Sequence, residues 1–135
     1  MKRPALALGV LLVALGGCVT SLPAGNFQAR GSLSAVTERM DAAIRACWFA
    51  SGENAFSDYV MESEISSLSG RPRVILVPRT TPGSLPVLVV DIRSYDRLGT
   101  VVSVYGPLTE GGPLTARING DIARWARGSR ACTGA

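Results

Sequence analysis

The apolar residues of this chain change their spacing twice, and these changes restrict the fold more than any other feature. From Leu33 to about Ser51 they recur every three or four residues, the period of an amphipathic helix. Over residues 56–105 they alternate with polar residues or form short runs, as in strands. The helical period returns between Pro113 and Gly128. The sequence therefore predicts a helix, a group of strands and a second helix.

Four strands are expected in the central part of the chain. The first alternates from Phe56 to Ile65 and places Glu62 and Glu64 on a solvated face. The other three are expected at residues 73–78, 87–92 and 100–105. Parallel strands need longer crossovers than the short connections found here, so we expect an antiparallel meander. With a helix before and after it, this gives an α+β fold, a two-layer sandwich with both helices on one face.

The first 17 residues have the organisation of a signal peptide. Lys2 and Arg3 give a positive start, and an apolar run follows from Ala5 to Leu15. This run is shorter than the roughly 20 apolar residues that a membrane-spanning helix needs. We therefore interpret it as an export signal.

The stretch Leu15-Gly16-Gly17-Cys18 ends this segment and resembles the lipobox of bacterial lipoproteins. The resemblance implies that a signal peptidase cuts before Cys18 and that its thiol carries a diacylglyceryl group. Acyl chains would then hold the protein on a membrane. Because Val19 rather than Asp follows the cysteine, the resemblance also implies the periplasmic face of the outer membrane. An ordinary secretory signal with a coincidental cysteine is the alternative.

A cut at this position divides the chain into a signal peptide (1–17), a lipidated tether (18–32) and one periplasmic domain (33–135). The tether prediction rests on turn-forming residues and the lack of an apolar period. After the cut, 12 arginines face 10 acidic residues, and no lysine remains. This small excess gives no reason to expect a nucleic-acid partner.

Two cysteines remain once Cys18 is assigned to lipid. In an exported protein, Cys47 and Cys132 are expected to form a disulfide. The alternative is two separate, buried free cysteines. A bond between them would join the first and last elements of the domain.

The stretch Ala43-Ile44-Arg45-Ala46-Cys47-Trp48, followed by short strands, resembles the C-terminal domains of TolA-type envelope proteins. In that family a helix ending in a Cys-Trp pair precedes a small antiparallel sheet. The match covers six residues and the coarse topology, and the Pro that often follows the pair is absent here. The resemblance implies a similar fold and nothing about function.

The sequence has no set of residues with the spacing of a known catalytic, cofactor or metal site. Its lack of His removes the commonest general base and metal ligand. Two cysteines without His do not make a usual zinc site. We therefore expect no enzyme, no cofactor and no metal. The alternatives are a lipid-anchored hydrolase or lyase that uses Glu62, Glu64 or Asp91, and a periplasmic inhibitor of an enzyme.

Four residues are candidates for contact with a partner. Arg71 and Arg73 flank a proline in a turn and could bind a phosphate or carboxylate. Tyr95 and Arg97 lie in a polar connection, where Tyr95 is expected to be exposed. The alternative for the arginines is a turn with ordinary surface charges. The sequence thus predicts a non-catalytic protein that binds an envelope protein or a cell-wall polymer.

Overall fold

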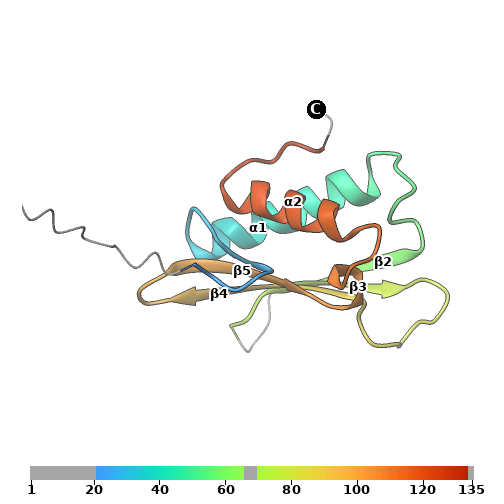
Figure 1. Cartoon of the computed structure of the whole chain (residues 1–135), viewed down its shortest axis with the longest axis horizontal. Helices are drawn as coiled ribbons and strands as arrows, with labels where there is room; N and C mark the ends of the chain where they lie inside the picture. Colours follow the sequence, from blue (N-terminus) through green and yellow to red (C-terminus); the bar gives the residue numbers. More distant parts are fainter. Residues whose placement is uncertain (1–20, 66–69, 134–135) are drawn as a thin grey trace, which may run out of the picture.

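The two helices of this protein lie on one face of an antiparallel sheet. The computed structural model describes residues 21–65 and 70–133 (Figure 1). Helices α1 (Leu33–Ile44) and α2 (Thr115–Ala126) run side by side above the sheet. No helix of the described ranges covers the opposite face of the sheet. The predicted α+β fold, a two-layer sandwich, is confirmed.

The sheet has the strand order β1-β5-β4-β3-β2, and each neighbouring pair is antiparallel. Its strands are β1 (Asn26–Gln28), β2 (Tyr59–Glu64), β3 (Arg73–Pro78), β4 (Leu88–Tyr95) and β5 (Gly99–Tyr105). The last four form the predicted meander. Strands β4 and β5 are longer than expected, because the chain reverses within residues 96–98 instead of through a longer connection.

The fifth strand, β1, corrects the prediction of four. It lies within the segment that we expected to be a tether, and it pairs with β5. The backbone N–H of Val104 donates to the carbonyl of Gly25 at 2.7 Å, and that of Ala29 donates to Thr100 at 2.8 Å. Three residues are too few to display a period of two, which is why the pattern gave no signal. The folded part of the chain thus begins before residue 33.

Helix α1 begins at Leu33, as predicted, but its α-helical part ends earlier than expected. Its N-cap is Ser32, whose hydroxyl accepts a hydrogen bond from the Ala35 N–H at 3.3 Å. The α-helix ends at Ile44 and continues as the π-helical turn η1 (Arg45–Phe49). Cys47 and Trp48 are neighbours in this turn and are both buried. The turn therefore supplies two adjacent side chains to the core.

Aromatic rings dominate the core between the two layers. Trp48 stacks on Phe56, with ring centroids 4.4 Å apart, and tilts against Trp125 at 5.5 Å. All three side chains are almost fully buried. Apolar residues from β3, β4 and β5 cover them from the sheet side; these include Val74, Leu76, Leu88, Val90, Ile92 and Val102. Both tryptophans therefore lie in the core between the helices and the sheet.

Cys47 and Cys132 form a disulfide, with their Cα atoms 5.2 Å apart. The bond joins η1 to the C-terminal tail beyond α2. It closes a loop with a sequence separation of 85, so nearly the whole sheet and α2 lie inside it. The predicted pairing is present in the structure.

The disulfide is expected to contribute much of the stability of the domain. The double substitution Cys47→Ala/Cys132→Ala should lower the free energy of unfolding by about 4 kcal/mol, because the unfolded chain gains conformational entropy. Urea unfolding of the wild type, with and without reductant, should show a loss of the same size. A free energy of unfolding that does not respond to reductant would contradict the pairing.

The close contact between β1 and β5 can be tested with two glycines. Gly25 has φ +77°, and an added Cβ would lie 2.7 Å from the Val104 carbonyl oxygen. Gly25→Ala should therefore lower the free energy of unfolding by about 1–3 kcal/mol, the usual cost of a strained backbone position. The matched control is Gly120→Ala in α2, where a Cβ meets nothing within 4 Å. That change should stabilise the helix by roughly 0.5–1 kcal/mol. Equal effects of the two substitutions in urea unfolding would show that β1 is not docked.

Candidate functional site

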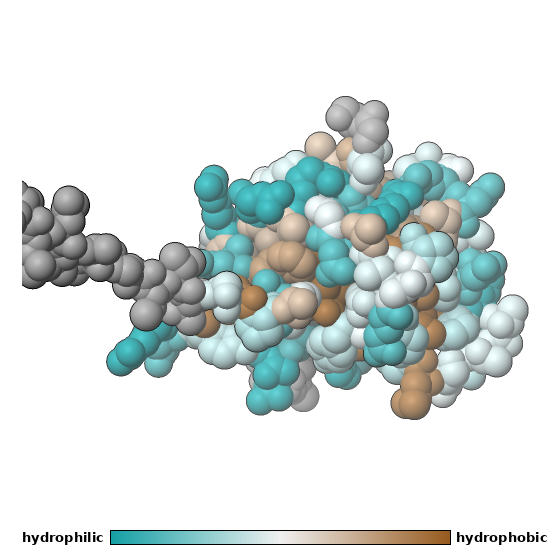
Figure 2. Space-filling view, viewed as in Figure 1, coloured by the Kyte–Doolittle hydropathy of each residue, from teal (hydrophilic) through white to brown (hydrophobic). Residues whose placement is uncertain are grey.

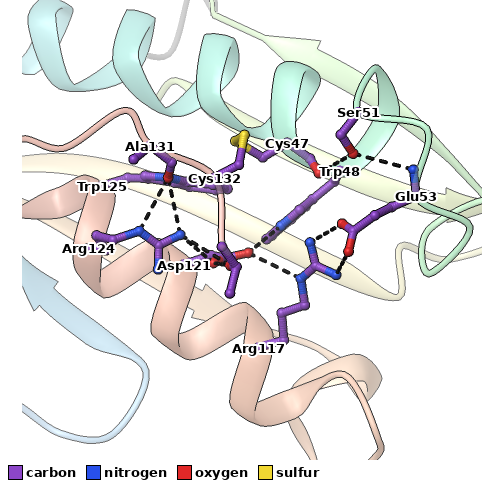
Figure 3. Close-up of polar contacts among 11 residues, drawn as sticks. Cys47, Trp48, Ser51, Glu53, Arg117, Asp121, Arg124, Trp125, Ala131 and Cys132 are labelled. Carbon is purple, nitrogen blue, oxygen red and sulfur yellow. Dashed lines mark hydrogen bonds and ion pairs between the residues drawn. A yellow bond between two sulfur atoms is a disulfide. The ribbon is translucent and has the colours of Figure 1, made fainter. Parts of the chain in front are cut away.

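The most constrained polar group of the protein is the carboxylate of Asp121 on α2, which is 1% exposed (Figure 3). The indole N–H of Trp48 donates to its Oδ2 atom at 2.8 Å. Arg124 donates to Oδ1 at 2.6 Å, and the Thr133 hydroxyl donates to the same oxygen. The carboxylate thus connects η1, α2 and the C-terminal tail.

The same network extends to the loop that follows η1. Arg117 lies one turn before Asp121 on α2, and its Nε atom is 3.5 Å from Asp121 Oδ2. The rest of its guanidinium group forms a two-point ion pair with Glu53, and Nη1 is 2.6 Å from Oε1. Hydrogen bonding from Arg117 lowers the pKa of Glu53. The guanidinium carbon also lies 5.5 Å from the centre of the Phe56 ring, so Arg117 closes one side of the aromatic core.

This network is suited to holding the fold rather than to catalysis. Burial opposes the ionisation of Asp121, but hydrogen bonds from Thr133, Trp48 and Arg124 outweigh it and lower the pKa of the carboxyl. Both oxygens already accept donors, so neither is available to attack a substrate or take up a proton at neutral pH. The sequence held one signal for this residue, because Asp121 lies on the same helix face as Ile118 and Trp125.

The two carboxylates predicted on one strand face, Glu62 and Glu64, do lie together on β2 and are exposed. Glu64 faces Arg73 across the strands, and its Oε2 atom is 2.5 Å from Arg73 Nε. This hydrogen bond lowers the pKa of Glu64, which opposes a role as a general acid. Asp91 of β4 likewise accepts a bond of 2.6 Å from Arg93.

The structure brings together only part of the predicted partner surface. Arg71 and Tyr95 line one open pocket of about 360 Å³, together with Arg93. Arg73 faces Glu64 on β2 and Asp91 on β4 across the strands, and it forms an ion pair with Glu64. Arg97 is exposed in the turn between β4 and β5 and does not line the pocket. We call the surface formed by Arg71, Arg93 and Tyr95 the sheet-end pocket.

Several predictions from the sequence concern residues or properties other than these contacts. Cys18 and the lipobox lie outside the described residues. Neither helix of the described part is long and apolar enough to cross a membrane. Within residues 21–65 and 70–133, no three His, Cys, Asp or Glu side chains form a group that could hold a metal ion.

Comparisons with known proteins give no match: no family model, no curated protein and no solved structure is similar to this chain. The resemblances to bacterial lipoproteins and to TolA-type domains therefore stay predictions from the sequence.

The Asp121 network makes the stability of the domain depend on pH. Because the folded pKa is lowered, ionised Asp121 stabilises the fold fully above its unfolded pKa of about 3.9, and this stabilisation is lost as the pH falls through the folded pKa. Asp121→Asn should cost roughly 3 kcal/mol at neutral pH, since it leaves buried donors around an uncharged group. The variant should also lose less stability than the wild type on acidification.

Urea unfolding over a pH series measures both effects. Glu62→Gln is the control, because Glu62 is exposed on β2 and surface substitutions usually change stability by less than about 0.5 kcal/mol. An Asp121→Asn variant with wild-type stability at neutral pH, or with the same steep decline in acid, would show that the network does not hold the domain together.

Proposed function

We propose that this protein is a lipoprotein of the bacterial envelope that acts by binding rather than by catalysis. It would be cut before Cys18 and held by acyl chains on the periplasmic face of the outer membrane. The observation that carries this proposal is the order of positive start, apolar run and Leu15-Gly16-Gly17-Cys18 at the N-terminus. A small domain closed by a disulfide suits an exported protein.

The state of the carboxylates supports a binding role over the hydrolase alternative. A carboxylate pair that cleaves a glycosidic bond must flank that bond from two sides. Glu62 and Glu64 instead project from one face of β2, and Glu64 is held by Arg73. Asp91 is held by Arg93. No residue favours the third possibility, an enzyme inhibitor.

The sheet-end pocket is the surface that we assign to the partner. Arg71 offers a planar set of N–H donors, and Arg93 offers those that its bond to Asp91 leaves free; such donors match carboxylate or phosphate groups. Tyr95 is 44% exposed and presents an aromatic ring beside them. This combination fits an acidic segment of an envelope protein or a cell-wall polymer that carries carboxylates.

The anchor can be tested through Cys18. Cys18→Ser should abolish incorporation of labelled fatty acid and leave an unprocessed precursor, because the thiol is the acylation site. Intact mass and fractionation of the cell envelope would report both changes. Cys132→Ser is the matched control, since it removes a thiol that is not expected to carry lipid and should leave acylation intact. A Cys18→Ser protein that is still acylated in the outer membrane would refute the anchor.

A further inference from the structure

One end of the domain is strongly basic. Four exposed arginines lie there, at the loop after β1, the β4–β5 turn and the residues after α2: Arg30, Arg97, Arg127 and Arg130. Hydrogen bonds connect these three segments. The Arg30 N–H donates to the Ala126 carbonyl at 2.9 Å, and the Gln28 side chain donates to the Leu98 carbonyl at 2.8 Å. Figure 2 shows hydrophilic side chains projecting from this end of the molecule. We call these four arginines the basic end.

A fifth arginine, which is buried, connects segments of the basic end. Arg39 is 9% exposed and donates to the carbonyls of Trp125 at 2.8 Å and Arg30 at 2.7 Å. Burial, and then the positive charge of Arg130, lower the pKa of Arg39. Arg39 thus donates to carbonyls at the end of α2 and in the loop after β1. These hydrogen bonds hold the two segments together.

The basic end differs in charge from the rest of the domain. The ion pairs of the described residues all involve other arginines: Arg45, Arg73, Arg93, Arg117 and Arg124. Within the part of the chain that the structure describes, the arginines of the basic end form none. Asp96 in the β4–β5 turn offsets one of the four exposed charges. A net positive surface therefore remains at this end.

The chain also enters the domain at this end. In Figure 1 the described chain, in blue, begins on the same side of the view as the β4–β5 turn and the C-terminal end of α2. Pairing of β1 fixes Gly25 against Val104, at the end of β5 away from the β4–β5 turn, and the Pro23 carbonyl accepts the Asn26 N–H at 3.1 Å. Pro23 lies five positions after Cys18, and a fully extended chain of that length spans about 17 Å. An anchor at Cys18 thus keeps the domain close to the membrane.

We propose that the basic end docks on anionic phospholipid headgroups of the leaflet that holds the anchor, an inference that rests on the proposed lipid anchor. The attraction between arginine and an anionic surface acts over a Debye length, about 8–10 Å at moderate salt. A tether that spans at most about 17 Å allows the domain to bring the arginines within that range. Docking at this end orients the domain and places the sheet-end pocket beside the membrane, because Tyr95 directly precedes the β4–β5 turn.

The first experiment separates docking from anchoring. The whole mature chain, with Cys18→Ser to remove any acyl group, is sedimented with vesicles of phosphatidylglycerol and phosphatidylethanolamine or of phosphatidylcholine alone. Binding is expected only to the anionic vesicles and is expected to weaken with salt. The triple substitution Arg30→Gln/Arg97→Gln/Arg127→Gln should weaken it on the order of 100-fold, since each basic residue near an anionic surface contributes roughly a factor of five.

A matched control removes the same charge elsewhere. Arg45→Gln/Arg73→Gln/Arg79→Gln changes three exposed arginines outside the basic end and should leave vesicle binding within about twofold of the wild type. Circular dichroism establishes that both triple variants are folded. Equal losses in the two variants, or equal binding to both kinds of vesicle, would overturn the proposal. Binding to short duplex DNA in place of vesicles, with the same arginine dependence, would overturn it too.

The second experiment uses the acylated protein in the same vesicles. Hydrogen exchange at residues 96–98 and 127–130 should slow in anionic vesicles relative to phosphatidylcholine, and the basic-end variant should lose this difference. Intact mass of the same sample reports acylation. A protein without an acyl group would refute the anchor while the sedimentation result still tests docking. An acylated protein with identical exchange in both kinds of vesicle would refute docking alone.

Discussion

The domain depends on the buried charge of Asp121. A carboxylate removed from water is destabilising unless donors surround it, and here the donors come from three separate parts of the chain. Trp48 extends the contact into the aromatic core, and Thr133 extends it into the tail beside the disulfide. The aromatic stack, the covalent bond and the end of the chain therefore share one electrostatic centre. Removing that charge would loosen all three at once.

The sequence was most informative where burial follows a regular period. The run of branched residues in β3 and the stripes of α1 and α2 could be predicted because their packing is periodic. The pairing of Cys47 with Cys132 could be predicted because these two cysteines remain once Cys18 is assigned to lipid in an exported protein. Strand β1 could not, since three residues show no period and their partner is distant in sequence. The roles of Asp121 and Arg39 could not either, because they depend on which carbonyls and indoles the fold brings near them.

The arginines show how one residue type takes several roles in a chain without lysine after the proposed cut. Arg117 is ion-paired and packed on an aromatic ring, and Arg39 is buried against backbone carbonyls. Arg127 is exposed after α2. A small net charge therefore says little about surface potential, because paired arginines cancel locally and exposed ones do not. The small net charge of the sequence therefore gave no indication of the basic end.

Strand β1 precedes Cys47 in the sequence, and the disulfide loop closes at Cys132, after α2. These positions also determine how the domain would carry mechanical load. A pull between the two ends of the chain first meets the short ladder between β1 and β5, and then α1. It cannot extend the chain between Cys47 and Cys132, because the covalent bond carries the force past that segment. Most of the sheet and all of α2 are thereby protected from stretching. Of the helices and strands in the described ranges, those that would lengthen under load are β1 and α1.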